Sequence, residues 1–218
     1  MKKYILMLLI TVLISFAITS CGEAEALPDG VTDASEHGIT PDNSAQENTE
    51  NLQRLIDTLY QSGGTVYIPR GEYKFAAGGT QTIGSHCIKM RSGVSIIGEG
   101  ELTVLKPVGE SSYGLDMFYF NEYLDTGVPV YLENCNFESF VIDGEKTSSE
   151  TYTSAGKGFM FNLFKNCHFK GVTVKNTDAT GFGVDCPINC TIIKDPPLPL
   201  RRCFYPFFVL LLLSCIFG

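Results

Sequence analysis

Asp185 is the side chain whose position in the sequence most favours chemistry. It follows Gly181-Phe182-Gly183-Val184 and holds the place that Asn162 holds after Gly158-Phe159-Met160-Phe161, 23 residues earlier. A carboxylate at the edge of a groove can donate or accept a proton, and a neighbouring amide can hydrogen-bond a ligand. We therefore predict that Asp185 is catalytic and that Asn162 binds substrate. The alternative is a ladder of Asn and Asp turns without chemistry.

Asp143 is a second candidate for acid–base chemistry, and Lys175 is a candidate for binding an anionic group. Asp143 stands nine residues after Asn134, as Lys175 stands nine residues after Asn166. The repeat described below therefore places the two side chains opposite each other on neighbouring strands, where opposite charges pair. The alternative to a catalytic Asp143 and a substrate-binding Lys175 is a surface ion pair of small energetic effect.

Asp178 and His168 complete the set of candidate residues. Asp178 lies in the polar turn 176–181, where it is either a catalytic or metal-binding carboxylate or a residue that closes the turn by local hydrogen bonds. His168 alternates with Cys167 and Phe169, so a strand that buries these two neighbours points the imidazole outward. There it could bind substrate, although a lone exposed histidine often has no specific role.

An internal repeat positions these candidates. Asn134-Cys135-Asn136-Phe137 returns as Asn166-Cys167-His168-Phe169 and as Asn189-Cys190-Thr191-Ile192, at separations of 32 and 23 residues. A unit of this length with only short strands cannot close a core alone, so successive copies must stack as coils of a solenoid, with strands about 4.8 Å apart. The longer first interval predicts a loop insertion around residues 145–156.

Stacking predicts columns of equivalent side chains that point inward and form the core. The expected columns are Cys135, Cys167 and Cys190; Phe137, Phe169 and Ile192; Phe140 and Val172; and Ile142 and Val174. We interpret most of the eight cysteines as buried small hydrophobes and not as a disulfide framework. Cys186 and Cys190 form a close pair, but they lack the partners of similar spacing that a zinc site requires.

One amphipathic helix precedes the strands. Ser44 and Glu47 have the spacing of a capping box, and apolar residues recur at helical spacing over residues 52–60, up to Gly63-Gly64. Short strands are predicted at 65–69, 73–75, 88–90, 94–97 and 103–105. Because no second helical pattern appears before the C-terminal tail, the chain is predicted to be all-β with a single helix.

Residues 42–105 resemble the N-terminal part of the pectate-lyase superfamily, which includes pectate lyases, polygalacturonases and phage tailspike depolymerases. The matching segments are 38–42, 49–59, 63–73 and 92–100. The resemblance implies a right-handed parallel β-helix whose first coil is capped by the helix, and it extends to about Ile193. In the family further coils follow and usually carry the active groove, so the solenoid is expected to be truncated at its C-terminal end.

The resemblance also implies a carbohydrate substrate. Cleavage of an acidic polysaccharide by β-elimination needs a base for the sugar C5 proton and a cation on the carboxylate, whereas inverting hydrolysis needs two carboxyl groups about 6.5 to 9.5 Å apart. The expected function is therefore that of a polysaccharide lyase or glycoside hydrolase. A non-catalytic glycan-binding or adhesive surface module and an incomplete, inactive remnant are the alternatives.

The N-terminal residues have the features of an export signal. Lys2 and Lys3 precede an apolar stretch over residues 4–18, and Ile18-Thr19-Ser20-Cys21 resembles the lipobox of bacterial lipoproteins. We predict a signal peptide over 1–21, lipidation of Cys21, and anchoring to the cell membrane or outer membrane, facing outside the cytoplasm. An ordinary signal peptide is the alternative. Residues 22–41 are predicted to be a flexible linker, and residues 42–193 the β-helix domain.

The C-terminal residues 194–218 differ in composition from the domain before them. Asp195-Pro196-Pro197 cannot continue a strand ladder, and the apolar run from Phe204 to Phe217 contains Pro206 and is shorter than the roughly 20 residues of a membrane span. We interpret this tail as a truncated or frame-disrupted end, with a transmembrane helix as the alternative.

The acidic composition limits the partners. A formal net charge of -8 and an isoelectric point near 4.9 argue against binding of nucleic acid, which requires clustered lysine and arginine. An anionic polysaccharide would need a local basic patch or a bridging cation, for which Ca²⁺ is the candidate. No other cofactor is predicted, and the sequence does not determine the oligomeric state.

Overall fold

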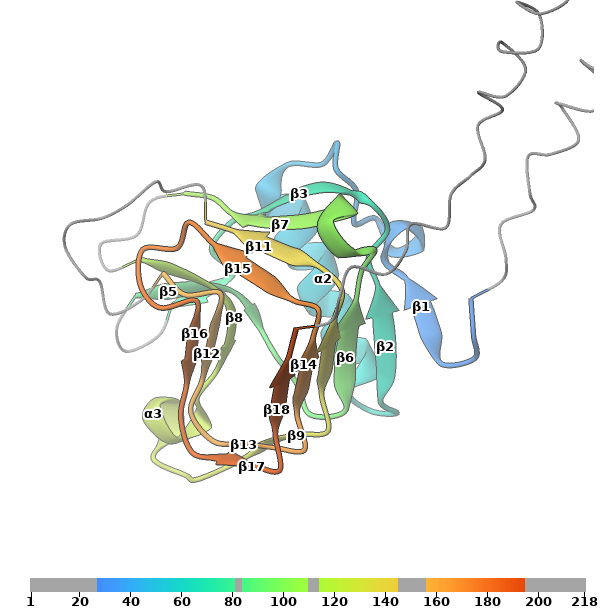
Figure 1. Ribbon diagram of the computed structural model, residues 1–218. Coiled ribbons are helices and arrows are strands. Elements are labelled where there is room, and N and C mark those ends of the chain that lie inside the picture. The colour runs from blue at the N-terminus through green and yellow to red at the C-terminus, as the bar shows by residue number, and fades with distance from the viewer. Residues whose placement is uncertain (1–26, 81–83, 110–113, 145–155, 195–218) are drawn as a thin grey trace, which may run out of the picture.

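Parallel strands wind into the coils of a β-helix in the computed structural model, which describes residues 27–80, 84–109, 114–144 and 156–194 (Figure 1). Sheet A holds, in spatial order, β1 (Val31–Asp33), β2 (Gly64–Tyr67), β6 (Val94–Ile97), β10 (Asn136–Glu138), β14 (His168–Lys170) and β18 (Thr191–Ile193). Sheet B holds β3 (Gly71–Phe75), β7 (Thr103–Pro107), β11 (Val141–Asp143) and β15 (Thr173–Lys175).

Two further sheets complete the coils. Sheet C holds β4 (Gly79–Thr80), β5 (Ser85–Lys89), β8 (Leu115–Phe120), β12 (Phe159–Phe161) and β16 (Phe182–Val184). Sheet D holds β9 (Leu132–Glu133), β13 (Phe164–Lys165) and β17 (Pro187–Ile188). Within the described residues every strand pair is parallel except β4 with β5. The predicted all-β parallel β-helix is thus confirmed.

The strand register follows the sequence repeat. Phe137 pairs with Phe169 and Phe169 with Ile192 in sheet A, and Phe159 pairs with Phe182 in sheet C. These partners are separated by the intervals of 32 and 23 residues read from the sequence, so the repeat correctly predicts which residues stack on neighbouring coils.

The repeated asparagines Asn134, Asn166 and Asn189 have a structural role at one corner of the coil. All three adopt left-handed backbone conformations, with φ of 59°, 52° and 52°, which Asn tolerates better than most residues. Their side chains form a ladder in which Asn166 Nδ2 donates to Asn134 Oδ1 at 3.2 Å and Asn189 Nδ2 donates to Asn166 Oδ1 at 2.8 Å. The repeat therefore conserves both the turn and its hydrogen bonds from coil to coil.

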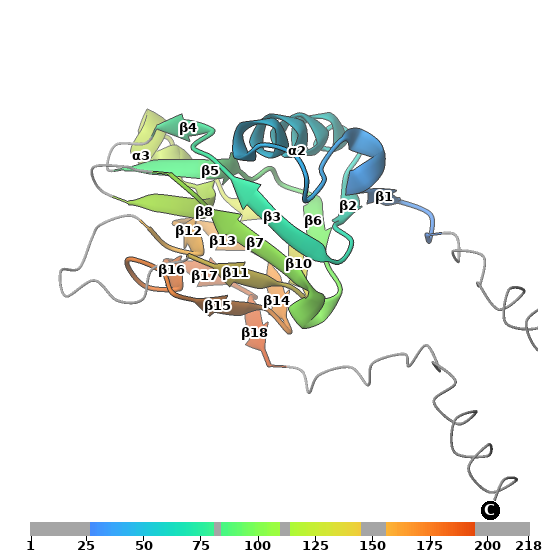
Figure 2. The same ribbon diagram turned by 90° about the horizontal axis from the view of Figure 1, so that it is seen from above.

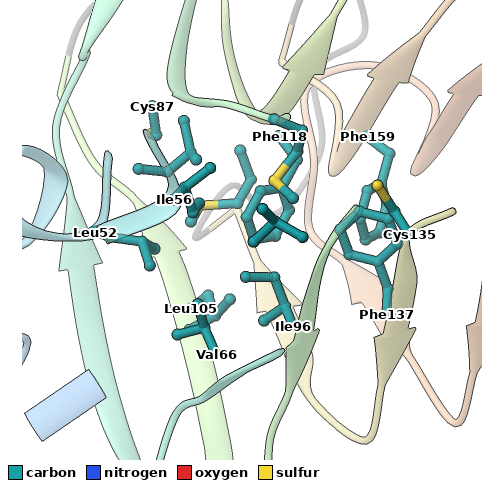
Figure 3. Packing of buried hydrophobic residues seen from close by; sticks show 14 of the residues in the cluster. Leu52, Ile56, Val66, Cys87, Ile96, Leu105, Phe118, Cys135, Phe137 and Phe159 are labelled. Carbon is teal, nitrogen blue, oxygen red and sulfur yellow. The ribbon is translucent and has the colours of Figure 1, made fainter. Parts of the chain in front are cut away.

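Aromatic side chains fill the middle of the described solenoid. Phe159 is fully buried and stacks on Phe118 of the preceding coil and Phe182 of the following coil, with ring centroids 5.4 and 5.1 Å from its own. Phe137 stacks on Phe169 at 5.1 Å, and Cys135 lies in the same core (Figure 3). The predicted inward column of cysteines is confirmed for Cys135 and Cys167, which are fully buried, and for Cys190, which is partly covered.

The helix α2 (Ala45–Leu59) covers the N-terminal end of the solenoid (Figure 2). The capping box is present, because Ser44 accepts from the Glu47 N–H and Glu47 accepts from the Ser44 N–H. Leu52 and Ile56 are fully buried against the first coil. Gln53 holds the helix to β5, since its Oε1 accepts from the Lys89 N–H at 2.8 Å.

The prediction of a flexible linker over residues 22–41 is wrong for residues 31–41. β1 extends sheet A by pairing with β2, a 3-10 helix spans Ala34–His37, and Ala34 and Ile39 are 0% exposed. The segment is mostly polar, so its composition did not indicate that the side chains of Ala34 and Ile39 are buried beside α2. Residues 22–26 lie outside the described residues, as do the predicted signal peptide over 1–21, most of the predicted insertion around 145–156, and the residues after Lys194.

Further elements were not predicted, β8 and the short helix α3 among them. β8 is buried along its whole length, so it lacks the alternation that marks a half-exposed strand. The helix α3 (Glu122–Thr126) has only five residues, too few for a periodic pattern. A second 3-10 helix spans Gly100–Leu102. Among the described residues no helix is both long and apolar enough to cross a membrane.

Candidate functional site

The predicted site residues lie on different sides of the β-helix. Asp143 and Lys175 are opposite each other on the outer face of sheet B, and Lys175 Nζ is 3.3 Å from Asp143 Oδ2, which confirms the predicted ion pair. Asn176 Nδ2 also donates to Asp143 Oδ1 at 2.8 Å. Both oxygens of Asp143 are therefore engaged within the protein, which favours the structural interpretation of this carboxylate.

His168 and Asp178 are also apart from each other. His168 pairs with Asn136 and Thr191 on sheet A, and its Nδ1 lies 2.8 Å from Thr191 Oγ1. Asp178 is half-buried in the corner between β15 and β16, where a Cβ added at Gly156 would lie 2.6 Å from the Asp178 Cβ. The structure therefore does not bring His168, Asp178 and Asp143 into one site.

Asn162 and Asp185 do lie together, at the end of the strands of sheet C. The Asn162 N–H donates to the Phe120 carbonyl at 3.1 Å, and the Asp185 N–H donates to the Phe161 carbonyl at 2.9 Å, so the two residues occupy the same position on neighbouring coils. Asp185 is exposed. Because Val184 packs against the core, the alternation of the strand places Gly183 and Asp185 on the outer face.

Lys157 is a further residue on this face that the sequence did not reveal. Its side chain crosses Gly183: a Cβ added there would overlap Lys157 Cδ and lie 2.7 Å from Cε. The Lys157 N–H donates to Asp116 Oδ1 at 2.6 Å, and Asp116 itself is 0% exposed. The outer face of sheet C thus carries the 6% exposed Lys157 over Gly183, two residues before the exposed Asp185.

A second polar cluster lies on the same face, nearer the N-terminal end. The His86 and Tyr119 rings stack with centroids 4.6 Å apart and planes 9° from parallel. Tyr119 Oη donates to Asp125 Oδ1 at 2.8 Å, and Lys89 Nζ forms ion pairs with Glu122 at 2.9 Å and Asp125 at 3.1 Å. Residues of β5 and β8 therefore hold α3 against sheet C.

Burial and the neighbouring charges shift the pKa values in this cluster. Burial and the Asp125 carboxylate raise the pKa of Tyr119 above its usual range. Burial opposes the charged form of Lys89, but the hydrogen bonds and charges of Glu122 and Asp125 outweigh it and raise the Lys89 pKa. Burial and the Lys89 charge lower the pKa of His86 to about 4, so its imidazole is neutral at neutral pH.

The shifted His86 pKa predicts a pH-dependent stability. The unfolded chain takes up a proton on His86 near pH 6.5, whereas the folded protein does so only near pH 4. The free energy of unfolding should therefore fall as the pH is lowered from 6.5 to 4, with His86 contributing up to about 3 kcal/mol. Urea unfolding at several pH values checks this, with His86→Phe as the comparison that removes the titrating group and keeps a ring against Tyr119. Identical pH dependence in both proteins would contradict the assignment.

Sequence signals for the missed residues exist but are weak. Asp116 is a charged residue inside the apolar run Leu115–Phe120, and Lys157 stands between Gly156 and Gly158. Neither pattern is specific without knowledge of the coil to which it belongs. Within the described ranges, no three His, Cys, Asp or Glu side chains are grouped closely enough to hold a metal ion. We therefore assign a Ca²⁺ site to none of the described residues.

The strand topology defines the class of the chain as a parallel β-helix protein. A family model described as rhamnogalacturonase A/epimerase, pectate lyase-like, matches residues 31–189, and the chain belongs to this family. The superfamily resemblance read from the sequence is thus confirmed. The match begins at β1, which agrees with the structural role of residues 31–41.

Individual relatives are more distant. The chain is 36% identical over 72 residues to the mannuronan C5-epimerase AlgE3 of Azotobacter vinelandii. These 72 residues are 33% of this chain and 4% of that protein. It also resembles the A-module of the mannuronan C-5 epimerase AlgE4 of the same organism, with 23% identity and a TM-score of 0.56 over 73% of this chain and 42% of the module. The AlgE6 A-module gives 20% identity and a TM-score of 0.52 over 72% and 40%. The chain therefore spans less than half of these modules.

Proposed function

We propose that this protein acts on an acidic polysaccharide that lies across the outer face of sheet C. The observation that carries the proposal is that the Lys157 side chain lies over Gly183 on the outer face of sheet C, two residues before the exposed Asp185. A uronate sugar presents a carboxylate next to an acidic C–H bond, so its recognition requires a cation and its chemistry requires a base. The names of the AlgE relatives, mannuronan C5-epimerases, support the same substrate class.

The two side chains have different roles in this proposal. The Lys157 side chain, which is 6% exposed, contributes a positive charge beneath the sugar carboxylate and stabilises the negative charge that develops when the C5 proton leaves. Asp185 accepts that proton, and Asn162 on the coil below hydrogen-bonds the sugar. The C5 electron pair then either expels the oxygen at C4, which is elimination, or recovers a proton from the opposite side, which is epimerisation.

Three polysaccharides test the proposed substrate class. The purified protein is incubated with polymannuronate, with polygalacturonate and with a neutral glucan, and calorimetry measures affinity while NMR follows the products. We expect binding of a polyuronate, weakened by salt because it depends on charge, and formation of either an unsaturated or an epimerised sugar. Preference for the neutral glucan would contradict the proposal.

Glycan binding without catalysis is the second candidate function. Asp185 follows β16, which is the last strand of sheet C among the described residues, so no described coil covers that side of the site. Fold alone does not imply activity. A tight complex with unchanged polyuronate would favour this candidate.

The proposal includes export and lipid anchoring at Cys21. It is supported by the basic start, the apolar stretch and the lipobox-like residues 18–21. In a bacterial host we expect the full chain in the membrane fraction and incorporation of labelled fatty acid. Cys21→Ser should abolish the label and prevent lipoprotein-type processing. Equal labelling of both proteins would contradict lipidation at this residue.

A further inference from the structure

The short helix α3 is held rigidly although five residues cannot form a stable helix alone. Asn121 Oδ1 caps its first turn by accepting from the Leu124 N–H at 2.9 Å, and Gly127 ends it in a left-handed conformation, with φ of 75°. Lys89 binds carboxylates three residues apart on the helix, Glu122 and Asp125. The side of α3 that carries these two acids therefore faces sheet C.

The remaining sides of α3 present apolar side chains to solvent. Tyr123 is 55% exposed and Leu124 43% exposed, and Val128 and Val130 follow in the same segment with similar exposure. Scattered exposed hydrophobic residues are ordinary, but four within eight residues on an anchored projection are typical of a contact surface.

The position of α3 links this surface to the proposed polysaccharide site. The outer row of sheet C runs in register through Lys89, Tyr119, Met160 and Gly183. α3 is fixed to the first two residues of this row by the Lys89 ion pairs and the Tyr119–Asp125 hydrogen bond. The row then continues through Met160 to Gly183, where the Lys157 side chain crosses it. A polysaccharide chain lying along the row would reach α3 at one end and the Lys157 side chain at the other.

We infer that Tyr123 is a stacking platform for a sugar ring of the polysaccharide, at a subsite separate from the reacting sugar. A pyranose has an apolar C–H face that packs on a flat aromatic ring, and tyrosine adds a polar tip that tolerates water. A rigid aromatic side chain binds with little loss of conformational freedom, which the anchoring of α3 provides. This inference rests on the proposed function, because the same polysaccharide occupies both places.

Affinity measurements with matched tyrosine variants test the inference. Calorimetry with long polyuronate chains should give about a tenfold loss of affinity for Tyr123→Ala, and little change for Tyr123→Phe, which keeps the ring. Tyr60→Ala is the control, because Tyr60 is similarly exposed, at 51%, but belongs to the end of the capping helix. Circular dichroism checks that each variant is folded.

The outcomes separate this inference from the proposed function. Failure of the unmodified protein to bind any polyuronate overturns both. Normal binding by the unmodified protein with equal affinities for Tyr123→Ala and Tyr60→Ala overturns the stacking platform alone. Light scattering that shows self-association lost in Tyr123→Ala, with unchanged polyuronate affinity, would assign the surface to contact between copies and would likewise overturn the inference.

Discussion

Replacing Asp185 with Asn is expected to lower turnover of an acidic polysaccharide by about 10²- to 10⁴-fold with little change in affinity. The substitution removes the proton acceptor but keeps the size of the side chain and its capacity for hydrogen bonds. Since Asp185 is exposed, the fold should not suffer. Steady-state kinetics with the preferred polyuronate, together with calorimetric affinity, measure the two effects separately.

Asp143→Asn is the matched control for this prediction. Asp143 is also an aspartate at the end of a short strand, but this strand is β11 of sheet B, and the side chain is held by Lys175 and Asn176. Its replacement should leave turnover unchanged. If Asp143→Asn is impaired as strongly as Asp185→Asn, or if Asp185→Asn retains full turnover, the assignment of the base to sheet C is wrong.

The largest expected loss of stability follows from Phe159→Ala, which should lower the free energy of unfolding by about 3 to 5 kcal/mol. Phe159 is fully buried and contacts aromatic rings on its own coil and on both neighbouring coils, including Phe118, Phe137 and Phe182. Truncation would leave a cavity between coils that a regular ladder of strands cannot close. Urea unfolding followed by circular dichroism measures the change.

Met160→Ala provides the control for this core substitution. Met160 is the next residue on the same strand but points outward and is only half-buried. Its truncation should cost about 1 kcal/mol or less. Similar losses for the two variants would contradict the inward position of Phe159 and the register of sheet C.

Much of the fold could be predicted because stacking imposes regularity on the sequence. The repeated Asn-Cys motif fixed the register of sheet A, and it succeeded because the Asn134 turn must recur on every coil for its ladder to continue. The capping box at Ser44 likewise reports a local hydrogen-bond pattern. Elements that depend on the rest of the protein were missed: β8 is buried on both faces, and β1 is ordered by pairing with β2.

The candidate site was predictable only in part. The repeat correctly paired Asp143 with Lys175 and Asn162 with Asp185, because both pairs follow from coil register. It could not show that these pairs lie on different sheets, nor that Lys157 crosses Gly183, since Lys157 precedes β12 and the equivalent residue 23 positions later is Thr180. The α3 cluster depends on contacts between β5, β8 and a short helix that has no repeat at all.

Exchange of the sugar C5 proton with solvent tests the central claim most directly. A polyuronate is incubated with the protein in D₂O, and NMR follows deuterium at C5 and the state of the C4 bond. Removal of the C5 proton by Asp185 predicts C5 deuteration without chain cleavage, or an unsaturated sugar with cleavage, and loss of either product in Asp185→Asn. New reducing ends with the C5 proton retained and no unsaturated sugar would instead mean hydrolysis and would contradict the account.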